Sequence, residues 1–297
     1  MKIKHVTAAI VLTALHIALP LTAQGKDSSI TARQVVERIK QNVTCPWAQK
    51  TNDTFKAGDP DTEVSGIAVT FMATYDMLRR AKDAGCNFII THEPTYYHGQ
   101  DNKSRLAPDA VIDTKDSFIT KHGLVIWRFH DHIHRTKPDG IVKGMVESLG
   151  WTAYQRKNDP RLFVRNETTL SEFVAELAKQ FYGGSLRVVG KPDMTFSRFG
   201  LSVGASGNLG QMKMLQTDDV EVLVAGETCE WETVEYVRDA SDAGMNKAMI
   251  VLGHANSEEA GMAYCGQWLK HFVTEVPIKH IPAGDPFWRP TMVIDNG

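Results

Sequence analysis

The stretch "VSGIAVTFMATYDMLRRAKDAGCNFIITHEP", residues 64–94, decides the fold. Its first apolar run predicts a buried strand. Thr74 then suits a helix N-cap, residues 75–84 predict a helix, and Gly85 is typical of a helix stop. The run "NFIIT", residues 87–91, predicts the next strand. Strand, helix and strand in this order form a βαβ unit, which brings the carboxyl ends of parallel strands to one edge of a sheet.

The same order recurs over residues 220–253. In both copies the expected helix ends in Asp-Ala-Gly, any residue, and Asn, at 83–87 and at 242–246. In both copies the following strand leads into a histidine, His92 and His254. Because strand ends are where such sheets place ligands, we interpret the recurrence as an internal duplication with a functional edge.

The rest of the chain also alternates between expected helices and strands. Residues 31–43 predict an amphipathic helix that opens with a capping box, Thr31 and Gln34. Alternation of this kind predicts an α/β fold with mixed sheets. We expect two related lobes, 24–155 and 156–297.

The N-terminal residues 1–23 have the three parts of a secretory signal peptide: two lysines, an apolar stretch, and small residues ending at Ala23. A buried first helix or a membrane anchor is the alternative, but the apolar run is short for a membrane span. We therefore expect cleavage after Ala23, a periplasmic or secreted protein, and no membrane contact after cleavage.

Charge and cysteine content narrow the function further. The formal net charge is -2 and the basic residues are scattered, so a nucleic-acid partner is not expected. The four cysteines, Cys45, Cys86, Cys229 and Cys265, lie far apart without a CxxC pair. Export permits disulfides, but buried free thiols are the simpler interpretation.

Three stretches carry side chains that can bind metals, and the first is "FIITHEP". His92 and Glu93 follow a strand directly, and Pro94 restrains Glu93 to extended geometry. Taken alone, such a pair at a strand end more often forms a solvent-facing turn than a pair of ligands.

The second stretch is "RFHDHIH", residues 128–134. If the preceding strand continues through it, His130, His132 and His134 share one face and Asp131 takes the other. A divalent cation would relieve the repulsion among protonated imidazoles by binding them neutral. The alternative is a polar surface loop.

The third stretch is "GHANSEEAG", in which His254 and Glu258 are four residues apart. With Asn256 or Ser257 as helix cap, this spacing puts both side chains on one side and can hold one cation. Ordinary exposed helices show the same spacing.

Together the three stretches supply three imidazoles and two carboxylates: His92, Glu93, His134, His254 and Glu258. These donors suffice for two divalent cations with a position left open for water or substrate. Nitrogen and oxygen donors without thiolate favour Zn, Mn, Fe, Co or Ni over Ca or Mg.

These motifs resemble those of the Nif-three-like family, the GTP cyclohydrolase I type 2 homologues, over most of the mature chain. The family's Thr-His-His-Pro corresponds to residues 91–94, and its His-Thr-Asn-x-Asp corresponds to residues 130–134. "FGLSVGASG" is similar to the family's glycine-rich strand and turn. The late family motif is matched by Gly226, Glu227, Gly253, His254 and Glu258.

The chain departs from the family pattern at two positions. Glu93 replaces the second histidine and His134 replaces the aspartate, so the set of donors is conserved but relocated. His130 matches the family motif, and we expect it to act as the catalytic acid or base, with Asp131 and His132 as supporting groups. The resemblance also implies a dinuclear metal site between the two lobes, which the C-terminal segment of the second lobe would complete, and a toroidal hexamer.

Three functions follow from these patterns. The first is a metal-dependent hydrolase of an unknown small-molecule substrate, in which paired cations activate water for attack on a phosphoester, amide or ring bond and His130 carries the proton. The second is a non-enzymatic metal-binding or partner-binding ring. The third is an exported protein with a histidine-rich surface, which predicts that His92, His134 and His254 lie apart.

Overall fold

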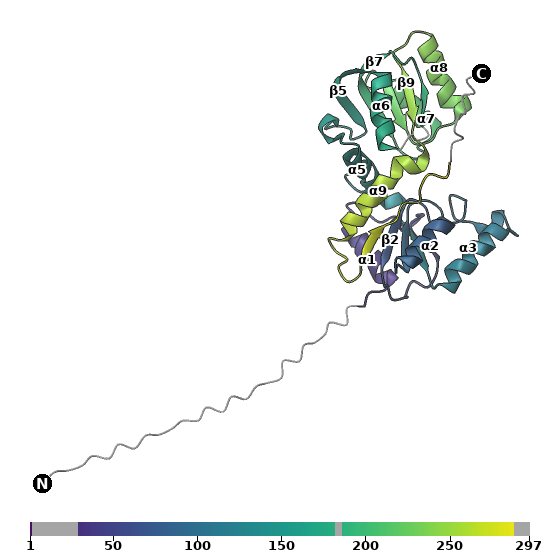
Figure 1. Cartoon of the computed structure of the whole chain (residues 1–297), viewed down its shortest axis with the longest axis vertical. Helices are drawn as coiled ribbons and strands as arrows, with labels where there is room; N and C mark the ends of the chain where they lie inside the picture. The colour runs from purple at the N-terminus through teal and green to yellow at the C-terminus, as the bar shows by residue number, and fades with distance from the viewer. Residues whose placement is uncertain (2–28, 182–185, 288–297) are drawn as a thin grey trace, which may run out of the picture.

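The computed structural model describes residues 1, 29–181 and 186–287, which form two α/β lobes joined by helix α9 (His254–Leu269) (Figure 1). The expected signal peptide lies outside the described residues, apart from Met1. In the described ranges, no helix is both long and apolar enough to span a bilayer.

The first lobe is a three-layer sandwich around a mixed sheet of order β1-β4-β3-β2-β10. Strand β1 is antiparallel to β4, and the other neighbours are parallel. Helices α1 and α9 cover one face, and α2 and α3 cover the other. The elements are α1 (Ala32–Asn42), β1 (Phe55–Ala57), β2 (Ile67–Thr70), α2 (Tyr75–Asp83), β3 (Phe88–Thr91), η1 (Lys103–Arg105), α3 (Ala110–Lys121), β4 (Val125–Arg128), α4 (Asp131–Arg135) and β10 (Ile278–His280).

The second lobe repeats this arrangement around a sheet of order β5-β7-β8-β9-β6. Its three central strands are parallel, and both edge strands are antiparallel to their neighbours. Helices α5 and α6 cover one face, and α7 and α8 cover the other. The elements are α5 (Gly140–Ser148), η2 (Thr152–Tyr154), β5 (Leu162–Thr169), α6 (Leu170–Gln180), β6 (Arg187–Val189), β7 (Thr195–Ser202), α7 (Asn208–Leu215), β8 (Val222–Ala225), the π-helix η3 (Glu230–Val234), α8 (Glu235–Asp242) and β9 (Ala248–Val251).

The central strands explain why the sequence predicts this fold class. Every residue of β2, β3, β8 and β9 is buried. Strands covered by helices on both faces have no polar side, and they therefore occur as continuous apolar runs. The α/β fold with two mixed sheets is confirmed.

The two copies of the Asp-Ala-Gly sequence adopt the same helix stop. Gly85 and Gly244 have φ of +77° and +78°, a left-handed conformation that glycine adopts without strain. The next residue donates its backbone N–H to the carbonyl five positions earlier, in one copy from Cys86 and in the other from Met245. Both copies thus form the same C-terminal cap, after which the chain enters a parallel strand.

The lobes are not consecutive halves of the chain. Helix α5 packs in the core of the second lobe, whereas β10 from the C-terminal segment forms the edge of the first sheet. The expected division of the chain into the units 24–155 and 156–297 stays a prediction. Helix α9 follows β9 of the second sheet and packs on the first sheet, so it ties the two lobes together (Figure 1).

The four cysteines are all free thiols, which agrees with the simpler interpretation of the sequence. Cys86 and Cys265 are buried, and Cys45 and Cys229 are half-buried. Burial raises the pKa of the Cys86 thiol above its ordinary value, which keeps it protonated.

Candidate metal centre

His92 and Glu93 leave the first sheet at the carboxyl end of β3, beside two parallel neighbours. The backbone N–H of Glu93 donates to the carbonyl of Phe71 at 2.8 Å, which holds the turn after the strand. His92 is fully buried, and Glu93 is partly exposed. Both side chains therefore lie at the sheet edge where α/β proteins place ligands.

The second stretch does not continue the strand, and the predicted alternation of its side chains is wrong. Strand β4 ends at Arg128, and helix α4 follows almost at once. Residues four apart in a helix share a side. His130 and His134 therefore face the cluster together, whereas His132 is turned into the protein and is fully buried.

Asp53 explains this change of direction. Its carboxylate accepts the backbone N–H groups of His130 (2.7 Å), Asp131 (2.8 Å) and His132 (2.9 Å). The first N–H groups of a helix lack internal partners, and negative charge is favourable there. The same carboxylate pairs with the His132 ring at 2.6 Å, and that ring stacks on Trp47 with centroids 3.6 Å apart. His132 thus supports the turn and does not reach the cluster.

Helix α9 supplies the third stretch. It begins at His254 after Gly253, so the expected caps Asn256 and Ser257 lie inside its first turn. His254 and Glu258 are one turn apart on the same side, as their spacing predicts. Glu258 is only 2 % exposed.

The three stretches converge on one cluster, and the expectation of a scattered histidine-rich surface is wrong. Its members are His92, Glu93, His130, His134, His254 and Glu258. The cluster contains two groups of residues whose possible ligand atoms all lie within 4.8 Å of one another inside each group. One group is His92, His130 and His134, and the other is His92, Glu93 and Glu258.

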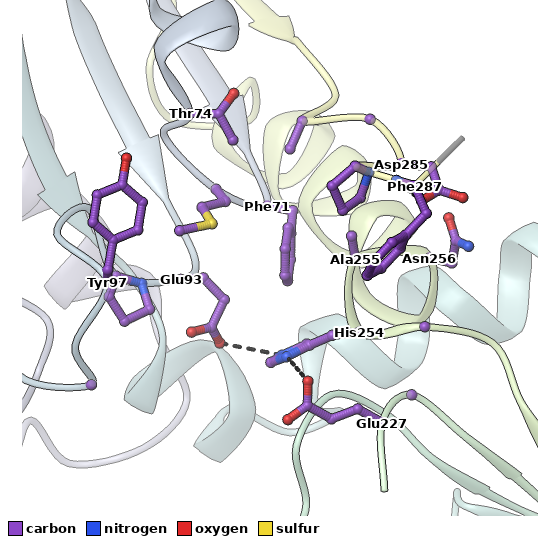
Figure 2. A pocket seen from close by; sticks show the side chains of 18 of the residues that line it. Phe71, Thr74, Glu93, Tyr97, Glu227, His254, Ala255, Asn256, Asp285 and Phe287 are labelled. Atoms are coloured by element: carbon purple, nitrogen blue, oxygen red, sulfur yellow. Dashed lines mark hydrogen bonds and ion pairs between the residues drawn. The ribbon is translucent and has the colours of Figure 1, made fainter. Parts of the chain in front are cut away.

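The Nε2 atoms of the four histidines point at the two carboxylates. Glu258 faces three of them, at 3.3 Å from His92, 3.1 Å from His254 and 3.8 Å from His134. Glu93 Oε1 lies 3.5 Å from Nε2 of His254 (Figure 2) and 3.6 Å from that of His130. His130 thus takes part in the cluster in the same way as the other three histidines.

The opposite ring nitrogen, Nδ1, has its own acceptor in every histidine of the cluster. Because each of these acceptors needs a hydrogen, each Nδ1 carries a proton, and each ring in its neutral form presents its Nε2 lone pair to the cluster. Metal-binding histidines are typically oriented in this way. The acceptors are the carbonyl of Phe129 for His92 (3.1 Å), Asp131 for His130, Asp139 for His134 and Glu227 for His254 (each 3.0 Å).

This arrangement fits a cation. Metal ligands must be neutral imidazoles, and in that form the nitrogen lone pairs of the four rings face carboxylate oxygens, so that a cation is needed between them. His92 shows the need most clearly, because its Nε2 is buried without a hydrogen-bond partner. Leaving such a group unsatisfied costs about 1–3 kcal/mol. The described residues therefore contain a group of histidines and glutamates that could hold a metal ion.

The carboxylates of the cluster are ionised at neutral pH. Burial alone would raise the pKa of Glu258, but His92 and His254 outweigh it and hold that pKa well below its usual value. The pKa of Glu93 is lowered against burial in the same way, chiefly by the hydrogen bond with His254. Burial disfavours protonation of His254, yet Glu258 and Glu93 raise its pKa to about 10. Without a cation the His254 ring therefore carries the positive charge between the two carboxylates at neutral pH, and a metal ion would take the place of its Nε2 proton.

Gly204, in the glycine-rich turn after β7, leaves room for Glu258. A Cβ at this position would lie 2.1 Å from Glu258 Oε1, and the residue has φ of +58°. Both facts exclude a larger side chain without a shift of the carboxylate. The turn therefore contributes space to the cluster.

Arg128 contacts Glu93 and the backbone of the segment that carries it. The guanidinium is 3 % exposed and donates to the carbonyls of His92 (3.0 Å) and Gly99 (2.5 Å). Its Nη2 lies 3.5 Å from Glu93 Oε2. Arg128 thus anchors both ends of the segment 92–99 to the end of β4.

The sequence patterns did not indicate the role of several residues that support the cluster. Asp139 caps helix α5 and also binds His134, and the pattern Pro-Asp-Gly before an apolar run could have indicated the cap. Glu227 was noted only as a motif position. No sequence signal singles out Asp53 or Arg128, because their partners are distant in the chain or belong to the backbone.

Two α/β lobes that share a helix and gather imidazoles and carboxylates between their sheets define a two-lobed α/β protein with a candidate metal centre. The chain belongs to the Duf34/NIF3 family (NGG1p interacting factor 3), whose pattern matches residues 30–285. The resemblance inferred from the motifs is therefore confirmed.

Individual relatives are distant. Two proteins named GTP cyclohydrolase 1 type 2 homolog, from Clostridium acetobutylicum and Clostridium perfringens, are 24% and 22% identical over 212 residues, which is 68% of this chain and 75% and 76% of theirs. The hypothetical protein SA1388 of Staphylococcus aureus has a TM-score of 0.69 at 17% identity, covering 88% of this chain and 99% of that one. Reduced HcgD from Methanocaldococcus jannaschii has a TM-score of 0.63 at 14% identity, with 85% and 98% covered. At these identities the two structures show the fold alone.

Proposed function

We propose that the cluster binds two divalent transition-metal ions and that the protein hydrolyses a small molecule there. The observation that carries this proposal is the convergence of four imidazole Nε2 atoms on two carboxylates. Four imidazoles and two carboxylates without thiolate favour Zn, Mn, Fe, Co or Ni. When bound, such ions supply Lewis acidity and lower the pKa of water.

The residues of the chain would divide this work as follows. The four histidines and the two glutamates would hold the ions, so we assign His130 to the ligands and not to proton transfer. Asp131, Asp139 and Glu227 would fix the ring orientations. Mutation of such supporting acceptors typically lowers metal affinity or activity by about 10–100-fold.

Two cavities give a substrate access to the cluster. One has a volume of about 830 Å³ and the other about 500 Å³, and Glu93 and His254 line both. Both volumes are in the range of small-molecule sites. Two relatives carry the name of a cyclohydrolase homologue, which agrees with a hydrolytic reaction.

The experiment is to measure metal content and hydrolysis together. Mature protein supplied with divalent salts should carry two ions per chain and hydrolyse at least one member of a panel of phosphoesters, amides and cyclic compounds. His254→Ala should lose the ions and the activity, whereas His271→Ala, at an exposed histidine outside the cluster, should keep both. Activity that survives in His254→Ala would remove the cluster from the reaction.

A non-enzymatic role would give a different result. Protein that binds its ions but hydrolyses nothing in the panel, and whose assembly falls apart on chelation, would be a metal-binding ring. We also propose a hexamer, by family resemblance, and export, by the three-part N-terminal pattern. Native mass and the N-terminal sequence of the exported protein test these two points.

A further inference from the structure

The larger cavity beside the cluster has features that the metal ligands do not explain (Figure 2). It is lined mainly by apolar side chains, although it borders the carboxylate of Glu93 and the ring of His254. An apolar cavity with a few polar groups at one end is the usual form of a small-molecule site. We call it the aromatic cavity, for the rings of Phe71, Tyr97 and Phe287 that border it.

All three rings border the space, and those of Tyr97 and Phe287 are exposed. Figure 2 shows Tyr97 and Phe287 on opposite sides, with Phe71 between them. Tyr97 is 48% exposed and Phe287 73% exposed, whereas Phe71 is 6% exposed and contacts the His254 ring edge-on at 5.2 Å. Exposed rings beside a cavity offer faces on which a flat ligand can stack.

Tyr97 is held in its position at a cost. Its φ is +54°, a left-handed conformation that is rare for tyrosine and costs about 1–3 kcal/mol. The ammonium of Lys115 lies 4.9 Å from the centre of its ring, a cation–π contact from inside the protein. Arg128 anchors the same segment through Gly99. The surrounding structure therefore presents this ring to the cavity.

The charges around the cavity limit what it can accept. Among the described residues, the lining has three carboxylates, those of Glu93, Glu227 and Asp285, and one guanidinium, that of Arg187. Glu93 and Glu227 pair with His254, and Arg187 pairs with Glu230. No lysine is among the described residues that line it. Polyanions such as polyphosphates are normally bound by several arginines or lysines. A neutral or cationic ligand suits these walls better.

We propose that the aromatic cavity binds a flat aromatic ring system, neutral or positively charged, that is attached to the group reacting at the cluster. This substrate class rests on the proposed function of the cluster. The ring would stack on Tyr97, and the polar end of the molecule would lie toward Glu93 and His254. Selection for the ring is a property of the chain itself and does not require bound ions.

The test uses four small probes on the full mature chain, with affinities measured by NMR titration. Benzamide and benzamidine are flat and are neutral and cationic, respectively; benzenesulfonate is flat and anionic; cyclohexanecarboxamide is neutral but not aromatic. Benzamide and benzamidine should bind at least about tenfold more tightly than the other two probes. Equal affinities would overturn the proposal.

Variants assign the binding to the cavity. Tyr97→Ala should weaken benzamide binding about tenfold, and Tyr97→Phe, which keeps the ring, should restore it. Tyr154→Ala is the matched control, because Tyr154 is also exposed but lies outside the cavity. Unchanged affinity in Tyr97→Ala would overturn the proposal.

Glu258→Gln separates this inference from the proposed function. The variant should lose the ions but keep benzamide affinity within about threefold, because the rings are intact. Wild-type protein that binds ions but shows no preference for flat probes would refute the aromatic cavity alone. Wild-type protein without ions that still prefers benzamide would refute the metal centre alone.

Discussion

Single residues set the geometry of the cluster through contacts that lie outside it. The acceptors at each Nδ1 decide which nitrogen of each ring faces inward. Gly204 acts differently, because it contributes space and not a bond. The donor set therefore depends on small residues as well as on the ligands.

We expect Gly204→Ala to lower metal affinity at least about tenfold, as changes next to ligands commonly do, because the new Cβ would displace the Glu258 carboxylate. Calorimetric titration with Zn²⁺ or Mn²⁺ measures the effect. Gly207→Ala is the matched control: Gly207 also has positive φ (+88°), but nothing lies within 4 Å of its Cβ position. Equal losses in the two variants would mean that backbone strain, and not Glu258, is the cause.

The burial of a single residue, Lys115, predicts that the free energy of unfolding depends on pH. It is 1% exposed and donates to the carbonyl of Thr95 at 2.6 Å. Burial lowers its pKa from 10.5 to about 8, against the opposing charges of Asp101 and Asp116. Between these pH values the unfolded chain binds a proton that the folded chain has released, so the free energy of unfolding rises with pH.

Lys115→Met should lack this rise. The difference in unfolding free energy between the wild type and the variant should stay constant below pH 8. It should then grow in favour of the wild type by up to about 3 kcal/mol by pH 10.5. Urea unfolding in the presence of a chelator, at several pH values, measures it. A difference that is flat across this window would show that the ammonium is not destabilised by burial.

At the scale of elements, the short helix α4 decides which histidines reach the cluster. A strand would have presented three of them on one face, whereas the helix presents His130 and His134 and buries His132. Asp53 causes the difference, because it accepts the N–H groups at the start of the helix. The element and its contribution to the site thus depend on one distant carboxylate.

Asp53→Asn should therefore weaken both folding and metal binding. One carboxylate oxygen is replaced by an N–H₂ group that cannot accept, which leaves buried donors of α4 unsatisfied and should cost about 2 kcal/mol or more. Chemical unfolding and metal titration check the two effects. Asp61→Asn changes an exposed aspartate of the same lobe and should leave metal affinity unaltered. Normal metal affinity in Asp53→Asn would show that α4 forms without this cap.

At the scale of the whole molecule, the cluster joins both lobes. His92 and Glu93 come from the first sheet, and Glu227, which orients His254, follows β8 of the second. Helix α9 begins at the second sheet and packs on the first (Figure 1). A ligand bound at such a junction is held only when both lobes are folded and docked.

Metal removal should therefore destabilise the whole chain. Ions present at about 1,000 times their dissociation constant should add about 4 kcal/mol to the free energy of unfolding. Chelation should lower the midpoint of thermal unfolding on the order of 10 °C in one transition. Calorimetry of the wild type and of Glu258→Gln tests this, because the variant should show no response to chelator. An identical midpoint with and without chelator in the wild type would contradict it.

The α/β fold class, the two matching βαβ units and the donors at the strand ends were all predictable from the amino-acid sequence. These features depend on local patterns: apolar runs where both faces of a sheet are covered, and a glycine stop after each helix. The spacing of His254 and Glu258 was readable for the same reason, since neighbours within one helical turn share a side.

Only the tertiary structure decided how residues 129–135 fold, that His130 joins the cluster and that β10 belongs to the first sheet. The physical reason is that these outcomes depend on contacts between distant residues. Asp53 lies 77 positions before His130, and its charge outweighs the tendency of an apolar strand to continue. A carboxylate that caps a helix from another part of the fold leaves no periodic signal in the sequence.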